Sequence, residues 1–363
     1  MKKILFITPN ISSGGGGAER QLVNTAVMLK EKGHDVEVVS YAEGEFYAHM
    51  LIDNNIKIHR KFEKTYLKRL FAIRKLIRNG NYDAVFSFLG TPNFINNFSA
   101  IGGKSWKVIT GERSAKESDF HTNHGKIFAW MQRYADNIVC NSENARNMWL
   151  KYYPKYEYKL VTIYNTINIP EISSIYKPKY NDKLNIVIAA SYRKLKNPIG
   201  LINALILMSE DERENINIKW YGKNDHGGDK MFYEQLNKMI IDNNLEKSLS
   251  LNPATNDIFN IVNKTDFVAL LSSVEGLPNT ICEGMMLGKP IIMSRVSDYN
   301  VLVDKNNGFL CDWDNPNSIK DALLEAAALN SNELNEMGKK SKEKANRLFD
   351  KKSNINKWES LIK

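Results

Sequence analysis

Short apolar runs rich in β-branched residues alternate with amphipathic stretches along the first half of the chain. Runs typical of strands cover residues 2–8, 35–40, 57–60, 83–88, 106–110 and 137–142. A helical pattern over 18–33 ends at Gly33, a residue type that commonly follows the last turn of a helix, and another covers 66–79. Strands that alternate with helices predict a parallel sheet with helices on both faces.

The same alternation starts again in the second half, after a polar connection at 173–183. The strand-like runs there cover residues 184–191, 217–222, 249–252, 266–271, 290–294 and 308–311. A chain of 363 residues corresponds to about two domains. The predicted fold class is therefore α/β, with two doubly wound Rossmann-like domains, at 1–170 and 180–349, facing each other across a deep cleft. Ligands of such sheets bind beyond the carboxyl ends of the strands, which places them in that cleft.

The composition is typical of a folded cytoplasmic protein. Hydrophobic residues make up 43% of the chain, and only ten residues are proline, so no long disordered segment is expected. Cys140, Cys282 and Cys311 are odd in number and lack metal-ligand spacing, which argues against a disulfide framework and a zinc site.

The basic start MKKILFITPN has an apolar run of only about four residues and no cleavage site, which favours a strand over a signal peptide. No run approaches the roughly 18 apolar residues of a membrane span.

The excess positive charge lies in the first half of the chain. Residues 1–170 contain 24 Lys and Arg against 15 Asp and Glu, whereas residues 171–363 contain 26 of each. Such a basic half can serve nucleic acid, an anionic membrane or an acidic substrate. In the helix at 66–79, Tyr66, Leu70, Ile73 and Ile77 form one stripe, and Lys68, Arg69, Lys75 and Arg78 lie largely elsewhere. We interpret it as a surface helix with a solvated basic face, with a membrane-docking helix as the alternative.

The turn after the first strand contains four successive glycines, at 14–17. Glycines before a helix let the backbone amides approach an anion closely. A dinucleotide fingerprint does not fit, because the third small residue of G-x-G-x-x-G would fall on Glu19 or Arg20. There is also no Walker lysine. The turn is therefore either an anion-binding backbone or a flexible loop.

Two cations follow the first strand of the second half. Arg193 and Lys196 lie between that strand and a helix that begins near Pro198. A fork-shaped guanidinium and a compact ammonium at the end of a strand are suited to a diphosphate. The alternative is a pair of exposed loop cations.

The segment SVEGLPNTICEG at 273–284 places Glu275 and Glu283 on either side of a turn from a strand into a helix. Gly276 allows an unusual backbone conformation, and Pro278 is suited to the first helical turn. The amides of 276–280 would then point toward an anion. Carboxylates would repel a phosphate, so the two acids are expected to bind the neutral hydroxyls of a sugar and a ribose. The alternative is a capped, solvated helix start.

Together these segments resemble glycosyltransferase family four, the retaining nucleotide-sugar enzymes with the two-Rossmann GT-B fold. The resemblance covers nearly the whole chain, and the Glu, seven residues, Glu pattern within EGLPN and followed by GKPII is its most specific part. The matching segments are GGAER, NSENARNMWLKYY, VTIYNTIN, ASYRKLKNP, EGLPNTICEGMMLGKPII and NNGFLCDWDNP. The resemblance also implies that the final residues 350–363, with a helix at 353–361, return to the first domain.

The resemblance assigns residue roles on the donor side. Glu283 would bind the ribose, and Arg193 and Lys196 would neutralise the diphosphate. The donor sugar would lie against Glu275 and the segment formed by Gly276, Leu277, Pro278, Asn279 and Thr280, and Gly16 and Gly17 would contribute from the other domain. Arg193, Lys196 and Glu275 would take part in catalysis. The nucleotide-sugar is a substrate, and neither a metal nor a cofactor is implied, in agreement with the lack of a metal-ligand motif.

The implied reaction is attack of an acceptor hydroxyl on the anomeric carbon, with retention of configuration and a diphosphate oxygen taking the proton. Many members carry a histidine near the acceptor. The comparable region here contains His121 and His124, but a single histidine is more often structural or exposed, so neither is assigned that role. Glu112 and Arg113, which follow the strand at 106–110, are expected to line the acceptor side.

The predicted function is transfer of a sugar from a nucleotide-sugar to a glycan or lipid-linked acceptor in the synthesis of a bacterial capsule, O-antigen or exopolysaccharide. UDP is the commoner nucleotide in the family, and GDP is the alternative. The basic first half would contact the inner face of the membrane. A nucleotide-sugar epimerase of the same fold is one alternative. Another is a non-catalytic protein that binds nucleotide-sugars or nucleic acid. The two acids argue against nucleic acid as the partner, because a phosphate-binding surface does not need them.

Overall fold

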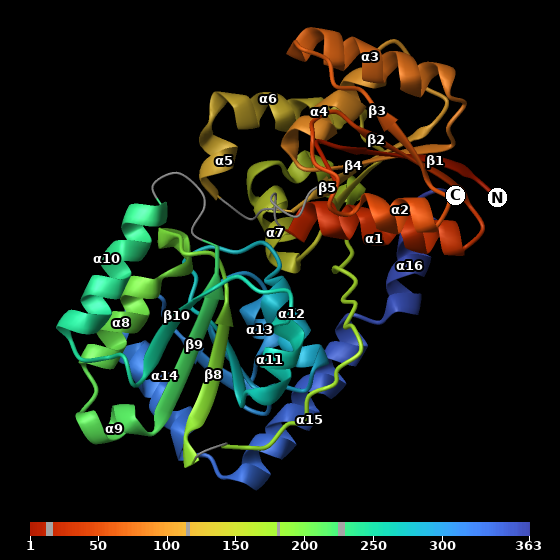
Figure 1. The fold of residues 1–363 in the computed structure, drawn as a ribbon. Helices are drawn as coiled ribbons and strands as arrows, with labels where there is room; N and C mark the ends of the chain where they lie inside the picture. The colour runs from red at the N-terminus through yellow and green to blue at the C-terminus, as the bar shows by residue number, and fades with distance from the viewer. Residues whose placement is uncertain (12–16, 114–116, 180–181, 224–228) are drawn as a thin grey trace. The chain divides into compact units, whose positions relative to one another are not determined.

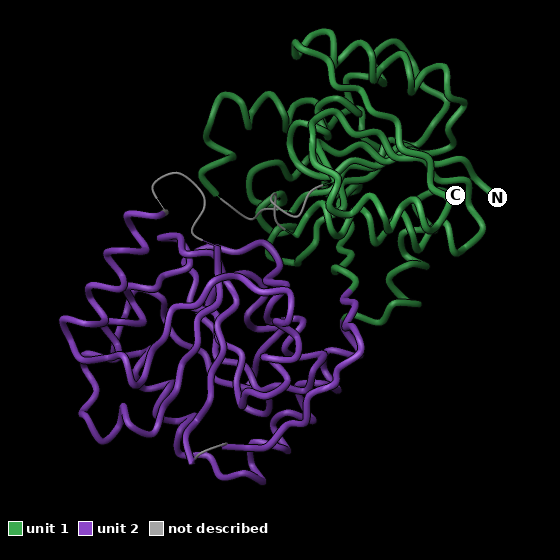
Figure 2. Tube along the Cα trace, viewed as in Figure 1, with its two compact units in different colours: residues 1–166, 349–363 green, residues 167–348 purple. Residues whose placement is uncertain are grey.

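The computed structural model describes residues 1–11, 17–113, 117–179, 182–223 and 229–363 (Figure 1). The chain forms two compact units (Figure 2). Unit 1 contains residues 1–166 and 349–363, and unit 2 contains 167–348. The division falls ahead of the predicted polar connection because Ser173, Ser174 and Tyr176 hydrogen-bond within unit 2, to Asn260 and Asp266.

Unit 1 is built on a seven-stranded parallel sheet with the order β3-β2-β1-β4-β5-β6-β7. Its strands are β1 Lys3–Thr8, β2 Asp35–Ser40, β3 Lys57–Arg60, β4 Ala84–Phe88, β5 Lys107–Glu112, β6 Asn137–Cys140 and β7 Leu160–Thr162. β1 and β4 pair in parallel at the centre, where the strand order reverses. Both strands are apolar runs buried almost throughout, as expected for a sheet covered on both faces.

Helices cover both faces of the unit 1 sheet (Figure 1). On one face, α1 Gly17–Glu31, α2 Ala48–Asp53 and α16 Lys351–Ser360 share one apolar core with the strands. On the other, α3 Tyr66–Asn79, α4 Gly90–Ser99, α6 Asn123–Met131 and α7 Glu143–Tyr152 share a second core. α5, Glu117–His121, precedes α6. The final helix α16 thus belongs to unit 1, where Trp358 contacts the rings of Phe86 and Phe88.

Unit 2 contains a six-stranded parallel sheet with the order β10-β9-β8-β11-β12-β13. Its strands are β8 Leu184–Ala189, β9 Ile216–Gly222, β10 Leu249–Pro253, β11 Phe267–Leu270, β12 Ile291–Ser294 and β13 Gly308–Cys311. Its helices are α8 Pro198–Ile206, α9 Glu210–Glu214, α10 Asp229–Asp242, α11 Ile258–Lys264, α12 Asn279–Met286, α13 Tyr299–Leu302, α14 Pro316–Ala328 and α15 Ser331–Leu348. The prediction of two doubly wound Rossmann-like α/β domains is confirmed.

Cys140, Cys282 and Cys311 are buried and form no disulfides. Within the described ranges, no helix combines the length and the apolar character that crossing a membrane requires.

Candidate active site

In unit 2, the loops that follow β8 and β11 are joined to each other. The backbone amide of Ser273 donates to the carbonyl of Leu195 at 2.9 Å, and the Thr280 hydroxyl donates to the carbonyl of Ala189 at 3.0 Å. These bonds hold the two strand ends together. The sequence-predicted segments 190–198 and 273–284 therefore form one continuous surface at the carboxyl ends of the central strands, where doubly wound sheets bind ligands.

Lys196 and Glu275 form an ion pair on this surface. Lys196 Nζ lies 2.5 Å from Glu275 Oε1, and the Ser272 hydroxyl donates to the same oxygen at 2.6 Å. The side chains are 19% and 12% exposed, so both can still reach a ligand. The sequence predicts both residues as site residues but does not predict their pairing. Ser272, the second residue after β11, was missed, although a polar residue directly after a buried strand is a usable signal.

Arg193 lies on the same loop as Lys196. Its side chain is exposed, and its amide donates to the carbonyl of Ser191 at 2.9 Å. Asn197 follows the loop in a left-handed conformation, with φ of 61°, and its side chain accepts the Gly200 amide to cap α8. Asparagine tolerates this conformation better than most residues. The cap fixes the direction in which the loop enters the helix.

The start of α12 has no side-chain cap. Pro278 is the residue before the helix, not part of its first turn as predicted, and it makes no capping hydrogen bond. The first amides of a helix have no partner inside the helix, so this end can receive an anion. Gly276 does not use the left-handed freedom that the sequence suggested, and its carbonyl accepts the Ser297 hydroxyl. Glu283 is half-buried on α12, beside the buried Cys282.

The glycine-rich turn can be described only in part. Gly17 is the first residue of α1, and Gly16 lies outside the described residues. Glu19, two residues further on, is buried, and burial raises the pKa of its carboxyl group. Among the described parts of the chain, no group of three or more His, Cys, Asp or Glu residues could hold a metal ion.

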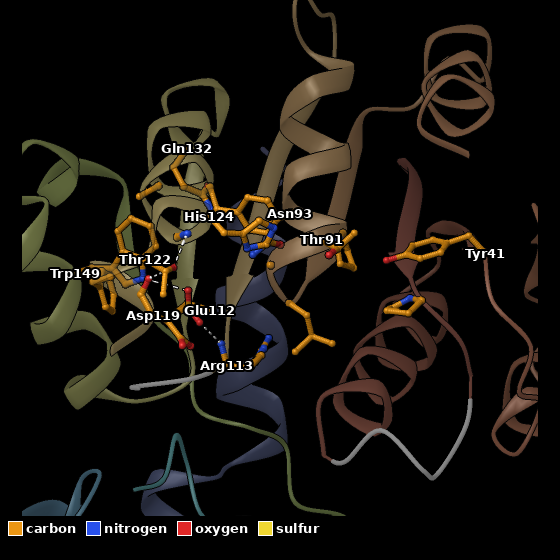
Figure 3. Close-up of a pocket in the computed structure, with 18 of the residues that line it drawn as sticks. Tyr41, Thr91, Asn93, Glu112, Arg113, Asp119, Thr122, His124, Gln132 and Trp149 are labelled. Carbon is orange, nitrogen blue, oxygen red and sulfur yellow. Dashed lines mark hydrogen bonds between the residues drawn. The ribbon is translucent and has the colours of Figure 1, made fainter. Parts of the chain in front are cut away.

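Unit 1 contains a cavity of about 680 Å³ (Figure 3). Its wall includes residues that follow the central strands and residues from α4, α6 and α7. In the close-up, Tyr41 lies on one side and Trp149 on the opposite side. The volume falls in the range of small-molecule sites. The wall contains aromatic rings beside acidic, amide and hydroxyl groups, so it suits a ligand with both apolar faces and many hydroxyls.

Glu112 and Arg113 both line this cavity. Glu112 Oε1 accepts the Arg113 amide at 3.0 Å, and Oε2 accepts the Trp149 indole N–H at 3.3 Å. The Arg113 guanidinium lies 3.8 Å from the centre of the Phe88 ring, and its Nη1 donates to Asn165 at 3.0 Å. Burial lowers the pKa of Arg113 to about 10, so the group remains charged at neutral pH.

A buried polar network holds Asn93 and Gln132 in the cavity wall. Asn93 accepts the Ser87 hydroxyl at 2.9 Å and donates to the carbonyl of Gly111 at 3.0 Å. Gln132 accepts the Thr110 hydroxyl at 2.8 Å. Both amides line the cavity, and the sequence analysis missed them because a lone Asn or Gln on a helix carries no motif. The network fixes α4 against the ends of β4 and β5.

Leu89, another wall residue, has a φ of 79°. A leucine pays a steric cost in this region, and such strained residues cluster at functional sites. No pattern in the sequence predicts a positive φ for a leucine. The conformation turns the chain sharply from β4 into α4 and brings Gly90, Thr91 and Pro92 to the cavity wall.

The two histidines of this region differ in position. His124 lines the cavity, with its ring 3.9 Å from that of Phe128. His121 contacts the edge of Tyr152 and is not among the wall residues. Of the two, the structure therefore brings His124 to the cavity.

Two family models match the chain. The model described as Glycosyltransferase Family 4 matches residues 15–170, and the model described as Glycosyl transferases group 1 matches residues 171–344. Their boundary lies close to the division between the two units.

Curated relatives share about a quarter of their residues with this chain. An uncharacterised glycosyltransferase of Haemophilus influenzae is 24% identical over 87% of each chain. An alpha-1,4-N-acetyl-D-galactosaminyltransferase of Campylobacter jejuni, named for an undecaprenol-PP-linked GalNAc acceptor, is 24% identical over 86% of each. A UDP-Gal:alpha-D-GlcNAc-diphosphoundecaprenol alpha-1,3-galactosyltransferase of Escherichia coli is 24% identical over 71% of this chain and 70% of its own.

Solved structures share the fold. HepE of Anabaena, in complex with UDP and glucose, has a TM-score of 0.83 at 17% identity, with 99% of both chains covered. The lipopolysaccharide outer core galactosyltransferase WaaB has a TM-score of 0.77 at 17% identity, again with 99% of both chains covered. With two Rossmann-like units and family matches that together run from residue 15 to residue 344, the chain belongs to the group 1 glycosyltransferases of family 4, which have the GT-B fold.

Proposed function

We propose that this glycosyltransferase moves a sugar from a UDP-sugar to a hydroxyl of a glycan or lipid-linked acceptor, with retention of configuration. The acceptor would belong to the synthesis of a bacterial capsule, O-antigen or exopolysaccharide. The observation that carries the donor side is the cluster of Lys196, Glu275 and Ser272 at the ends of β8 and β11. The names of the Campylobacter and Escherichia relatives, which include undecaprenol-linked acceptors, support the acceptor class.

The donor chemistry follows from the charges at these strand ends. Arg193 and Lys196 would bind the diphosphate, helped by the uncapped start of α12. Lys196 has three N–H donors, and its bond to Glu275 uses one, which leaves two for phosphate oxygens. Glu275 would accept hydroxyls of the donor sugar, and Glu283 would accept those of the ribose. The segment from Gly276 to Thr280 would line the same site.

In the proposed reaction, the acceptor oxygen forms a bond to the anomeric carbon while the bond from that carbon to the diphosphate oxygen breaks. The diphosphate leaves with the bonding electron pair, and one of its oxygens takes the proton of the acceptor hydroxyl. Arg193, Lys196 and the amides of α12 would stabilise the charge that develops on the leaving group. The proposal includes no metal and no cofactor, because these fixed charges supply the stabilisation.

The cavity of unit 1 is the proposed acceptor site, with Glu112 and Arg113 in its wall. Its mixture of rings and hydrogen-bonding groups is that expected for a sugar. Glu112 is held by the Trp149 indole and by the Arg113 amide, so its carboxylate has a fixed direction. Such preorganisation favours binding, because little side-chain freedom is lost when the ligand arrives.

We also propose that unit 1 contacts an anionic membrane on the cytoplasmic side. On α3, Leu67 and Phe71 are 64% and 57% exposed, and Lys68 and Lys75 are exposed on the same side of the helix. Lys64, also exposed, lies just before the helix begins. This side of the helix is therefore amphipathic. The sequence analysis had favoured a face that is only basic and solvated. Ring contacts continue from Phe71 across α4 to Phe128 on α6, through Phe98 and Phe94. Exposed apolar groups beside lysines suit anionic lipid.

Calorimetry with UDP, GDP and NAD tests the donor proposal. UDP is expected to bind, GDP more weakly, and NAD not at all. Failure of both UDP and GDP to bind would overturn the proposal. Incubation of UDP-sugars without acceptor is the second arm, because conversion of the sugar to its epimer would show that the protein is an epimerase and not a transferase.

A further inference from the structure

Two cations of unit 1, the half-buried Arg74 and the buried Lys159, donate their hydrogen bonds to backbone carbonyls. Arg74 donates to the carbonyls of residues 98, 99 and 101 at 2.5, 2.9 and 2.7 Å. Lys159 donates to the carbonyls of residues 132, 133 and 135 at 3.3, 2.8 and 2.6 Å. Such filling is expected, because a buried charged donor without a partner is costly.

Arg113 differs from both of these cations, because two of its nitrogens are unfilled, whereas Arg69 in the same wall has one such nitrogen. The Nε and Nη2 atoms of Arg113 are both buried, and neither has a hydrogen-bond partner among the residues that the structure describes. Only Nη1 is used, in the bond to Asn165 at 3.0 Å. Within the same described ranges, no carboxylate forms an ion pair with this guanidinium. The acid next to it in the sequence, Glu112, accepts the Arg113 backbone amide, and its charge acts on the guanidinium without a direct ion pair.

The two unfilled atoms lie on one edge of the guanidinium. Nε–H and one Nη2–H point in parallel along that edge, and this is the geometry that receives two oxygens of a carboxylate or phosphate. The bond from Nη1 to Asn165 occupies the other side of the group. The donor pair that remains is therefore a complete bidentate fork.

Aromatic rings hold the plane of this fork. The guanidinium lies 3.8 Å from the centre of the Phe88 ring and 5.7 Å from that of Trp358. Gly111 makes room for the Phe88 ring, since a Cβ atom at that position would lie 2.4 Å from a ring carbon. Strand ends β4 and β5 and helix α16 thus combine to fix the direction of Arg113. A group fixed in this way loses little entropy when it binds a ligand.

We propose that the Nε/Nη2 edge of Arg113 binds an anionic group with two oxygens, a phosphate or a carboxylate, which a substrate brings to the cavity of unit 1. The inference rests on the proposed function for the identity of the substrates. Arg113 would then set specificity, because an uncharged substrate would leave the fork unfilled. The anion has two possible sources, the diphosphate of the donor or an acid group on the acceptor.

Calorimetry on the full chain separates these sources. UDP serves as the probe for the donor phosphate, and glucuronate and glucose 6-phosphate serve as probes for an acceptor carboxylate and an acceptor phosphate. Arg113→Gln removes the charge, and Arg113→Lys keeps a charge without the fork. Both variants are expected to bind the relevant probe about ten- to hundredfold more weakly, as expected for charge-assisted hydrogen bonds. Arg74→Lys, which changes another ring-stacked arginine outside the cavity wall, should leave these affinities unchanged.

The outcomes are distinct. A loss confined to UDP would assign the fork to the donor, and a loss confined to the sugar acids would assign it to the acceptor. Equal affinities of wild type and both Arg113 variants for all three probes would overturn the inference. If the wild type fails to bind UDP and GDP but still binds glucuronate through Arg113, the proposed function fails and the anion site stands.

A second variant keeps the test valid if the Arg113 variants unfold. Asn165→Asp leaves the guanidinium in place and puts a carboxylate at the position that now accepts from Nη1. The new charge would partly neutralise Arg113, so the affinity for the anionic probe should fall about tenfold. Unchanged affinity in a folded Asn165→Asp variant would also overturn the inference, because an anion on Arg113 must sense that charge.

Discussion

The Glu275 carboxylate accepts bonds from Lys196 and Ser272 at the same oxygen. Glu275→Gln keeps the shape of the side chain but removes the charge that would compete with a phosphate for Lys196. We expect the variant to bind UDP at least as tightly as the wild type. Its transfer rate from a UDP-sugar should fall about ten- to hundredfold, because an amide is a weaker acceptor for sugar hydroxyls. Calorimetry and initial rates measure the two effects.

The control is Glu336→Gln, which changes an exposed carboxylate on α15 that pairs with Lys339. It should alter neither UDP binding nor the rate. If Glu275→Gln abolished UDP binding, Glu275 would contribute to the nucleotide and not to the sugar, and the assignment of roles would need to be reversed.

Glu283 is the residue proposed to bind the ribose. Glu283→Ala should weaken UDP binding about tenfold, as expected for loss of hydrogen bonds to a charged acceptor. The sharper measurement compares UDP with 2′,3′-dideoxy-UDP. The wild type should prefer UDP, and the variant should bind both nucleotides alike. A variant that still discriminated between them would exclude the ribose role.

The sequence predicted Lys196 and Glu275 as site residues, but not that they form an ion pair. Lys196 and Glu275 are 79 residues apart, and their ion pair depends on the bond between the Ser273 amide and the Leu195 carbonyl. Local periodicity contains no information about such a lateral contact. For the same reason, the sequence placed Arg113 on the acceptor side but could not show that Phe88 and Asn165 would hold it.

At the scale of elements, prediction worked best where hydrophobic residues recurred at helical spacing over several turns. The helix expected at 66–79 is α3, Tyr66–Asn79, because its buried stripe contains Leu70, Ile73 and Ile77 at helical spacing. Short elements were harder. β7, Leu160–Thr162, was not among the predicted strands, because a run of three residues is too short to show a strand pattern in the sequence. The positive φ of Leu89 depends on tertiary packing and has no sequence signal.

We expect the buried Lys289 to make the free energy of unfolding of unit 2 depend on pH. It is 2% exposed, donates to the carbonyl of Asn263 at 2.6 Å and lies 3.4 Å from the centre of the Tyr176 ring. Burial lowers its pKa from 10.5 to about 7. Between these two values the unfolded chain binds the proton and the folded chain does not. The free energy of unfolding should therefore rise with pH in this window, by up to about 1.4 kcal/mol per pH unit, and the effect should vanish below pH 7.

Chemical denaturation between pH 6 and pH 9.5 measures this effect as a difference between the wild type and Lys289→Met. The buried thiols also titrate at alkaline pH, but they are common to both proteins and cancel in the difference. Lys264→Met, at an exposed position at the end of α11, is the control and should show the slope of the wild type. A Lys289→Met slope equal to that of the wild type would contradict the shifted pKa.

α16 is expected to be essential for the stability of unit 1. Trp358 is buried and packs on Phe86 and Phe88, with ring centres 5.8 and 5.6 Å away. Trp358→Ala should lower the free energy of unfolding of unit 1 by about 3–5 kcal/mol, because it leaves a large cavity. Trp313→Ala, at a side chain that is 41% exposed, is the matched control in unit 2. Hydrogen exchange resolved by unit checks the result, and equal protection in both variants would contradict it.

At the scale of the whole molecule, the uneven charge distribution can be related to the exposed side of α3. The first half of the sequence contains the whole charge excess, and α3 presents Lys68 and Lys75 on the side of the exposed Leu67 and Phe71, with the exposed Lys64 just before the helix. Charge alone would give weak, salt-sensitive attraction to any anion. The added apolar groups favour a lipid surface, because they can enter the interface while the lysines contact the headgroups.

Flotation with vesicles tests this surface. The wild type should float with vesicles containing phosphatidylglycerol, and less so as salt rises or in pure phosphatidylcholine. Lys64→Gln with Lys68→Gln should weaken partitioning by about 2 kcal/mol, or roughly thirtyfold. Leu67→Ser with Phe71→Ser should weaken it at every salt concentration, because the apolar contribution is not screened. The matched control, Met231→Ser with Ile241→Ser, removes apolar groups of unit 2 that are 77% and 61% exposed, and it should float as the wild type does. If all these variants floated alike, α3 would be only a solvated basic helix, and the membrane contact would have to be abandoned.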